Sequence, residues 1–174
     1  MDQAVHHQPD LALAEGAALY PPVGYTHTSV VLMPSPVQGH GLFANTPIPK
    51  GTTLCSWSGY PVDRAAVPQL SDQAKRYIIR VHGSSDFMLS SPLVDAMVGG
   101  ALDLDTIGSM FMVNSAIHCN CRATQMSINQ YNRFRGQPQL PRDVAGVMRD
   151  VIVLKARRDI QAGEELTYNY GVTH

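Results

Sequence analysis

Two tyrosines near the end of the sequence are the residues whose type and spacing first suggest chemistry. Tyr168 and Tyr170 lie in the run "ELTYNYG", which begins at Glu165. The run has strand character, so both rings are expected on the same side of the chain. Two adjacent phenols could take part in catalysis, but aromatic pairs at this spacing more often fill a core. The pair alone does not decide between a core and a site.

A second candidate is the glycine-flanked turn in "QGHGLFA", where Gly39 and Gly41 surround His40. Glycines at alternate positions allow a positive φ, or let the backbone come close to a flat ligand. Most such pairs are simple turns, and an exposed loop imidazole is the simpler explanation of His40. This turn is weak evidence by itself.

A third candidate is the run "VNSAIHCNC", which starts at Val113 and holds several soft metal donors. These donors are His118, Cys119 and Cys121. A closed zinc site needs four donors, usually as two spaced pairs, and the remaining cysteine, Cys55, is far away in sequence. A polar loop satisfied by the Asn114 and Asn120 side chains is the stronger interpretation, so we expect no metal.

The composition argues against several classes of protein. The 174 residues suffice for one domain. No window approaches the roughly 18 to 20 apolar residues of a spanning helix, so no membrane association is expected. A formal charge of −1 and a pI near 6.6 provide no global basic field, so nucleic acid is not an expected partner. Three cysteines without a secretion signal predict an intracellular protein, in cytoplasm or nucleus.

The texture of the chain predicts an N-terminal arm over residues 1–25 and one β-rich domain over residues 26–174. Short strand-like runs broken by Gly and Pro fill the domain, which favours small sheets over parallel α/β units. The predicted strands are "SVVLM", "GLFA", "TTLCSWSG", "FMLSS", "TQMSIN", "DVIVLKA" and "ELTYNY".

Other segments break this strand pattern. Ser71 is expected to cap a short helix that turns into a strand from Ile78. The apolar spacing from Asp103 to Val113 suits one short helix. The segment "NRFRGQPQLPRD" is predicted to be an exposed loop between two hairpin strands.

The C-terminal run "KARRDIQAGEELTYNYG" predicts a strand, a turn and a second strand that ends in the two tyrosines. In this order and spacing it resembles the closing signature of SET-domain protein lysine methyltransferases. The run "GHGLFANTPIPKGTTLCSWSG" resembles the opening signature of that family, and "FMVNSAIHCNC" resembles its middle motif, with Asn114 and Asn120 on the two motif asparagines. The resemblance extends from about Thr28 to Gly171.

The resemblance implies a mainly β fold of short curved sheets with a knot-like C-terminal segment and a variable insert at about residues 63–102. It implies transfer of a methyl group from S-adenosylmethionine to a lysine side chain of a protein or peptide, histones being the commonest targets. The implied cofactor-binding residues are Gly39, His40, Gly41, Asn114, Ser115 and Tyr170. The implied catalytic residues are Tyr170, the tyrosine at the phenylalanine/tyrosine switch, Tyr168, and a channel wall, Trp57.

The sequence also departs from the family pattern. Ser115 replaces the motif histidine, and Trp57 replaces a tyrosine that lines the lysine channel. The cysteine-rich tail that closes this channel in many relatives does not follow, so we expect the arm, a second subunit in a homodimer, or the substrate to close it. These departures keep open a non-catalytic lysine- or peptide-binding module on the same fold, and an unrelated β domain whose tyrosines are core.

Acidic residues around the insert could grip a basic peptide or form a solvated rim. They are Asp86, Asp95, Asp103 and Asp105.

Overall fold

The computed structural model describes residues 18–81, 87–102, 104, 107–141 and 149–170. The strands in this part of the chain are β1 Val30–Pro34, β2 His40–Ala44, β3 Thr53–Ser56, β4 Tyr60–Val62, β5 Ile78–Arg80, β6 Phe87–Leu89, β7 Asn114–Ser115, β8 Cys121–Ser127, β9 Asp150–Ala156 and β10 Thr167–Tyr168. The helices are α1 Asp72–Lys75, α2 Ser91–Val98 and α3 Ile128–Phe134, with 3-10 turns at Val67–Gln69 and Met110–Met112. None of the helices in these residues is long and apolar enough to span a bilayer.

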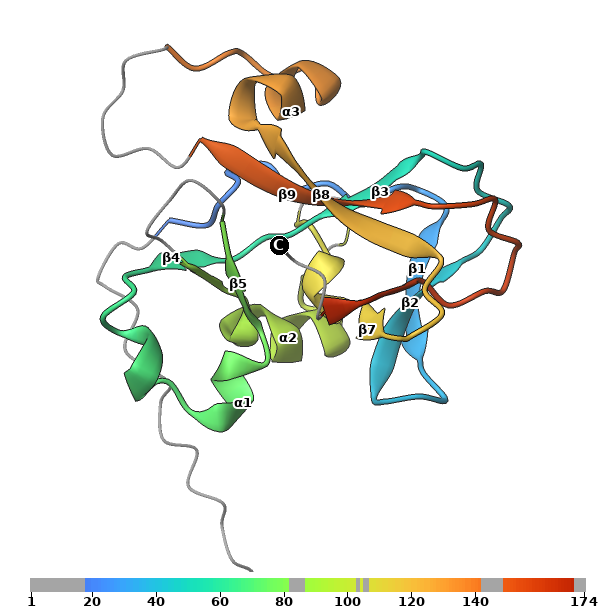
Figure 1. The fold of residues 1–174 in the computed structure, drawn as a ribbon, viewed down its shortest axis with the longest axis horizontal. Helices are drawn as coiled ribbons and strands as arrows, with labels where there is room; N and C mark the ends of the chain where they lie inside the picture. The colour runs from blue at the N-terminus through green and yellow to red at the C-terminus, as the bar shows by residue number, and fades with distance from the viewer. Residues whose placement is uncertain (1–17, 82–86, 103, 105–106, 142–148, 171–174) are drawn as a thin grey trace, which may run out of the picture.

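These strands form several small sheets rather than one large one (Figure 1). The central sheet is antiparallel, with β9 between β3 and β8. β1 pairs with β2, and β6 lies between β4 and β5, again antiparallel. The short pair of β10 and β7 is parallel. The predicted mainly β fold of short sheets is confirmed.

β9 is the buried central strand of the largest core cluster. Val151, Val153 and Leu154 in this strand are all 0% exposed. Leu54 of β3 and Leu166 join them in the same core cluster. A strand covered on both faces carries such a continuous apolar run, which explains why "DVIVLKA" was recognisable as a strand in the sequence. α3 covers this sheet next to β8 and β9 (Figure 1).

The short helix predicted after Ser71 is present as α1. Ser71 Oγ accepts a hydrogen bond from the Ala74 N–H at 3.1 Å, which is the expected N-cap geometry. The chain then enters β5 at Ile78, where its β-branched residues predicted a strand.

The predicted loop between two hairpin strands is wrong in its first part. β8 and β9 do pair antiparallel, but α3 lies between them and ends at Phe134, and exposed residues 136–141 follow. A capping box starts the helix: Ser127 Oγ accepts from the Gln130 N–H at 3.2 Å, and Gln130 Oε1 accepts from the Ser127 N–H at 3.0 Å. This Ser-x-x-Gln signal was present in the sequence and was overlooked.

The helix predicted between Asp103 and Val113 is also wrong, as far as the structure describes that stretch. Its described residues hold only the 3-10 turn Met110–Met112. Gly108 donates its N–H to Ser58 Oγ at 2.7 Å, and a Cβ at Gly108 would collide with the neighbouring backbone. This tertiary contact overrides the helical spacing.

The predicted strand, turn and second strand are present as β9, a turn at residues 162–163 and β10, but β10 does not pair with β9. Ile160 bridges Ile48 instead, and Glu165 bridges Phe43 at the end of β2. β10 then runs parallel to β7, so the last part of the described chain lies beside β7 and β2 (Figure 1). This path carries both tyrosines to the motif that contains Asn114.

The described residues of the predicted arm, 18–25, pack on the domain. Tyr20 is buried and exchanges two backbone hydrogen bonds with Gly59, at 2.9 and 3.0 Å. The Val23 carbonyl accepts a hydrogen bond from the buried Tyr131 hydroxyl at 2.9 Å. Residues 1–17 lie outside the described part of the chain.

Candidate functional site

A cavity of about 780 Å³ brings together segments that are distant in sequence. Its lining includes six of the eight residues singled out in the sequence, namely Trp57, Gly39, His40, Asn114, Tyr168 and Tyr170. The other two lie next to it. Gly41 lies against the Glu165 carboxylate and the Asn114 amide, and Ser115 Oγ accepts from the Tyr170 N–H at 3.4 Å.

One side of the cavity, here called the polar wall, consists of Gln38, Gly39, His40 and Asn114. Ser35 shapes the turn that precedes it, because Ser35 Oγ accepts from the Val37 N–H at 3.0 Å and the Ser35 N–H donates to the Gly39 carbonyl at 2.8 Å. Gly39 has a φ of +54°, which favours glycine. The turn therefore presents its backbone in a fixed conformation.

Asn114 connects this turn to the C-terminal segment. Its Nδ2 lies 3.3 Å from both the Gln38 and His40 carbonyl oxygens and donates to Glu165 Oε1 at 2.7 Å. A Cβ at Gly41 would displace the Glu165 carboxylate from its place beside the Asn114 amide. Glu165 was not among the predicted site residues. Its neighbour Glu164 has the same side chain, so the sequence offered no signal to separate the two.

A second group of lining residues, here called the aromatic wall, consists of Trp57, Phe111, Tyr168 and Tyr170. The two tyrosine rings lie together, with centroids 4.8 Å apart, as their alternate positions predicted. Tyr168 is only 5% exposed, whereas Tyr170 is 47% exposed. The Tyr170 hydroxyl nevertheless turns inward and donates to the Val113 carbonyl.

Both phenols are protonated at neutral pH, since the reference pKa of tyrosine is about 10. Burial raises the pKa of Tyr168 well above its usual range, and a charge on neighbouring Tyr170 would raise it further. Burial of the inward hydroxyl, with a smaller contribution from Tyr77, raises the pKa of Tyr170 to about 12 although part of its ring is exposed. Both groups therefore act as neutral donors and aromatic surfaces rather than as general bases.

Trp57 is an enclosed part of the aromatic wall. It is 4% exposed and meets the Phe111 ring edge to face, with centroids 6.4 Å apart. A backbone hydrogen bond of 2.8 Å to the Ile152 carbonyl ties it to the central sheet. Its buried Nε1 has no hydrogen-bond partner among the described residues, so this N–H is an unpaired buried donor.

The insert contributes a basic rim, made of Lys75 and Arg76, to the same cavity. Lys75 Nζ lies 3.8 Å from the exposed Asp72 carboxylate. Of the acidic residues expected near the insert, Asp95 is exposed on α2 and does not line the cavity, while Asp86, Asp103 and Asp105 lie outside the described part.

The possible metal donors have other surroundings. The Cys121 Sγ donates to Asn120 Oδ1 at 3.1 Å, and burial raises its pKa to about 12. Burial also raises the pKa of Cys55 far above its usual range, so both remain thiols. Cys119 Sγ accepts from Arg157 at 3.3 Å. In the part of the chain that the structure describes, no three His, Cys, Asp or Glu side chains gather as a metal site.

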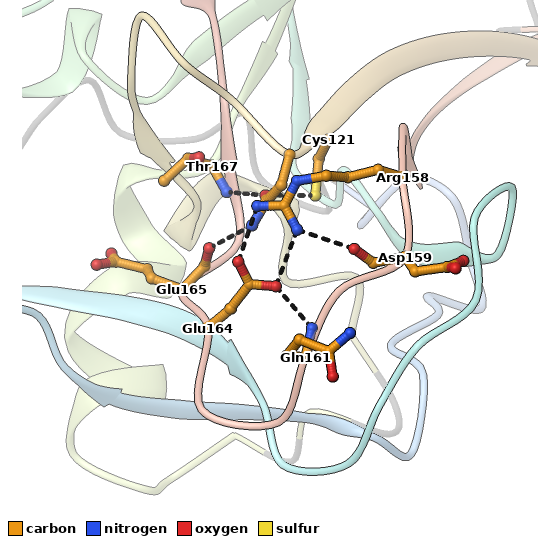
Figure 2. Close-up of polar contacts among 8 residues, drawn as sticks. Cys121, Arg158, Asp159, Gln161, Glu164, Glu165 and Thr167 are labelled. Carbon is orange, nitrogen blue, oxygen red and sulfur yellow. Dashed lines mark hydrogen bonds and ion pairs between the residues drawn. The ribbon is translucent and has the colours of Figure 1, made fainter.

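Asn120 fastens the C-terminal segment that supplies the two tyrosines. Its Nδ2 donates to the Glu165 carbonyl at 2.8 Å, and its Oδ1 accepts from the Thr167 N–H at 2.9 Å (Figure 2). Because Asn120 is only 5% exposed, these two backbone groups rely on its side chain, rather than on water, as their hydrogen-bond partner.

The preceding glutamate has a different role. Glu164 forms two hydrogen bonds with the Arg158 guanidinium, at 2.8 and 2.9 Å, and accepts from the Gln161 N–H at 2.6 Å (Figure 2). The bonds from Arg158 and Gln161 lower the pKa of this carboxyl. Glu164 closes the turn before the C-terminal segment, whereas Glu165 faces the polar wall.

Comparison with solved structures first defines the class of fold. A Plasmodium falciparum protein, provisionally assigned as a histone methyltransferase, matches with a TM-score of 0.52 and 15% identity over 84% of this chain and 96% of that chain. A humanized mutant of Chaetomium thermophilum Polycomb Repressive Complex 2, solved with the inhibitor GSK126, matches with a TM-score of 0.52 and 22% identity. That match covers 82% of this chain and only 15% of the other.

The SET-domain family model matches residues 39–171. The chain therefore belongs to the SET-domain family. No curated protein matches it in sequence.

Proposed function

We propose that this protein is a protein-lysine N-methyltransferase that uses S-adenosylmethionine. The observation that carries this proposal is that one cavity is lined both by the polar wall and by two tyrosines and a tryptophan. The volume of about 780 Å³ is within the range of cofactor and ligand pockets. Its substrate class is a lysine-containing protein or peptide, with histones as one candidate.

The polar wall fits the amino-acid part of the cofactor. The Gln38 and His40 carbonyls and the Asn114 amide supply acceptors for an ammonium group, while Lys75 and Arg76 supply donors for a carboxylate. Main-chain groups of Gly39, Gly41 and Ser115 would complete the contacts. Bound there, the cofactor supplies a methyl group activated by its sulfonium charge.

The aromatic wall fits a lysine amine that must lose its proton before it attacks. A lysine has a reference pKa of about 10.4, and an enclosed apolar site disfavours its charged form. Trp57 and the two tyrosines provide such an enclosure, and their faces orient the cation before it deprotonates. Tyr170, held at the Val113 carbonyl, presents a neutral phenol toward the reacting groups. Holding the amine in line with the methyl group supplies much of the rate.

Tyr168 supports monomethylation as the preferred outcome. Tyr168 is 5% exposed, and in the proposed complex its hydroxyl would occupy space that a second methyl group needs. Product masses test this. Wild type should give mainly the monomethyl product and Tyr168→Phe should shift it toward dimethyl and trimethyl products, whereas a trimethyl product from both would remove the idea.

A non-catalytic lysine-binding module is the second candidate, because Ser115 and Trp57 depart from the family pattern. Calorimetric titration separates the two. A methyltransferase binds S-adenosylhomocysteine, whereas a module that only holds a lysine has no need of it.

The 47% exposure of Tyr170 supports closure of the site by another surface, such as a second subunit of a homodimer.

We also propose a catalytic domain over residues 26–174, with the insert at about 63–102, working inside the cell. The β4–β6–β5 sheet, α1 and α2 lie within that insert apart from the first strand, β4, at Tyr60–Val62.

Radiolabelled S-adenosylmethionine tests the proposed activity directly. Wild-type protein, incubated with a panel of histones and with whole-cell extract, should label a protein on lysine, and Tyr170→Phe should not. A wild-type protein that binds no cofactor and labels nothing would refute the proposal.

A further inference from the structure

We propose that Glu165 is a positioning residue that holds the Asn114 amide with its oxygen free for the cofactor's ammonium group. This inference rests on the proposed function and adds a residue that does not itself line the described cavity. It also assigns an orientation to the ligand, with its amino group at Asn114 and its carboxylate toward the basic rim.

The orientation of the Asn114 amide follows from its neighbours. An asparagine amide is placed by its hydrogen-bond network, since oxygen and nitrogen are nearly identical in shape. Around Nδ2 lie a Glu165 carboxylate oxygen at 2.7 Å and the carbonyl oxygens of Gln38 and His40 at 3.3 Å. All three are acceptors only, so a flipped amide would place its oxygen against three other oxygens.

The Glu165 carboxylate contributes most to this preference. Its bond to Asn114 is the shortest of the three and involves a charged acceptor, which strengthens a hydrogen bond. Its other oxygen, Oε2, accepts from Ser35 Oγ at 3.0 Å, and Ser35 in turn caps the glycine turn. One carboxylate therefore fixes both the turn and the asparagine of the polar wall.

This arrangement selects the charge of the ligand group that meets Asn114. Both N–H groups of the amide point toward acceptors of the protein, so Oδ1 is the atom left to meet a ligand. An acceptor backed by a carboxylate favours an ammonium and repels a carboxylate. The ligand's carboxylate must then lie elsewhere, and Lys75 and Arg76 are the cationic side chains in the described lining.

The adjacent glutamate provides a matched control. Glu164 has the same side chain but pairs with Arg158 at the surface turn (Figure 2). Glu165→Gln keeps size and hydrogen-bonding capacity at the site but adds a donor that can face a flipped Asn114. Glu164→Gln makes the same chemical change at a neighbouring position.

Calorimetry with two probes tests the proposal. The first is S-adenosylhomocysteine, and the second is its analogue with hydrogen in place of the amino group. Glu165→Gln should lower the affinity for the first probe about tenfold and leave the affinity for the second within about twofold of wild type. Glu164→Gln should change neither affinity. In an Asn114→Ala background, Glu165→Gln should have no further effect, because Glu165 acts through Asn114.

Other outcomes overturn the inference. Unchanged affinities, equal losses for both probes, or additive losses in the double variant would each show that Glu165 does not act through the amide. If thermal melting shows that Glu165→Gln is unfolded, Ser35→Ala replaces it, with an expected loss of about threefold for the first probe only. If Glu165→Gln loses affinity selectively but no lysine is methylated by wild type, only the proposed function fails. If wild type binds neither probe, both fail.

Discussion

The polar wall and the aromatic wall of the cavity differ in how their polar atoms are satisfied. On the polar wall, the Asn114 amide nitrogen meets three acceptors, and Glu165 fixes it. On the aromatic wall, the Trp57 Nε1 is buried without a partner in the described structure, and burial keeps the Tyr170 phenol neutral. A preorganised hydrogen-bonding surface contributes to binding of a ligand, whereas a desolvated aromatic surface changes the reactivity of an amine.

Because the two walls differ in this way, cofactor affinity and the rate of methyl transfer should respond to different substitutions. Substitutions on the polar wall should change cofactor affinity, and substitutions on the aromatic wall should change the methyl-transfer rate. The segment from Glu165 to Tyr170 joins the two walls. A substitution of Asn120, which fastens this segment, should therefore change both cofactor affinity and the methyl-transfer rate.

The largest expected effect is therefore at Asn120. Asn120→Ala leaves the Glu165 carbonyl and the Thr167 N–H without their partners. We expect a loss of about 3 kcal/mol in the free energy of unfolding, together with loss of cofactor binding. Urea denaturation measures the first and calorimetry the second. If Asn120→Ala is as stable as wild type, the anchoring role is wrong.

Tyr170→Phe should have the next largest effect, confined to turnover. Removing the hydroxyl that donates to the Val113 carbonyl should lower kcat by about 100-fold, while cofactor affinity stays within about threefold. Single-turnover kinetics at saturating cofactor make the measurement. An equal loss of affinity would erase the distinction between the two walls.

Asn114→Ala should show the opposite pattern. Without the amide oxygen, the affinity for S-adenosylhomocysteine should fall by about tenfold, and kcat at saturating cofactor should change by less than about threefold. Calorimetry and initial rates check both values. A drop in kcat with unchanged affinity would contradict the binding role of the polar wall.

Trp57→Phe should have the smallest effect and should appear in the pH dependence. A smaller ring leaves the lysine amine better solvated, so its pKa should rise toward about 10.4, and the limb of the profile on which the rate rises with pH should shift upward by about half a pH unit. Because the pKa of Tyr170 is raised to about 12, its phenol stays protonated below that pH and should not make activity fall between pH 8 and about pH 11. A rate profile identical to that of wild type would show that Trp57 does not desolvate the amine.

The sequence predicted local features well. The β9 run of Val151 to Leu154, the cap at Ser71 and the glycine turn before β2 each follow from nearby residues. The clustering of Tyr168, Tyr170 and Asn114 also followed from motif order once the family resemblance was recognised.

The missed features depend on contacts between distant residues. Glu165 and Asn114 are separated by 51 positions, and no local pattern distinguishes Glu165 from Glu164. Gly108 replaces an expected helix by a turn because of its contact with Ser58, 50 positions away. The pairing of β10 with β7 likewise depends on how the C-terminal segment passes β2.

A crystal structure of the protein with S-adenosylhomocysteine and a lysine peptide tests the central claim most directly. We expect the ligand's amino group within hydrogen-bonding distance of Asn114 Oδ1 and its carboxylate toward Lys75 and Arg76. The lysine amine should approach the sulfur past Tyr168 and Tyr170. A ligand bound outside this cavity, or bound with its carboxylate on Asn114, would contradict it.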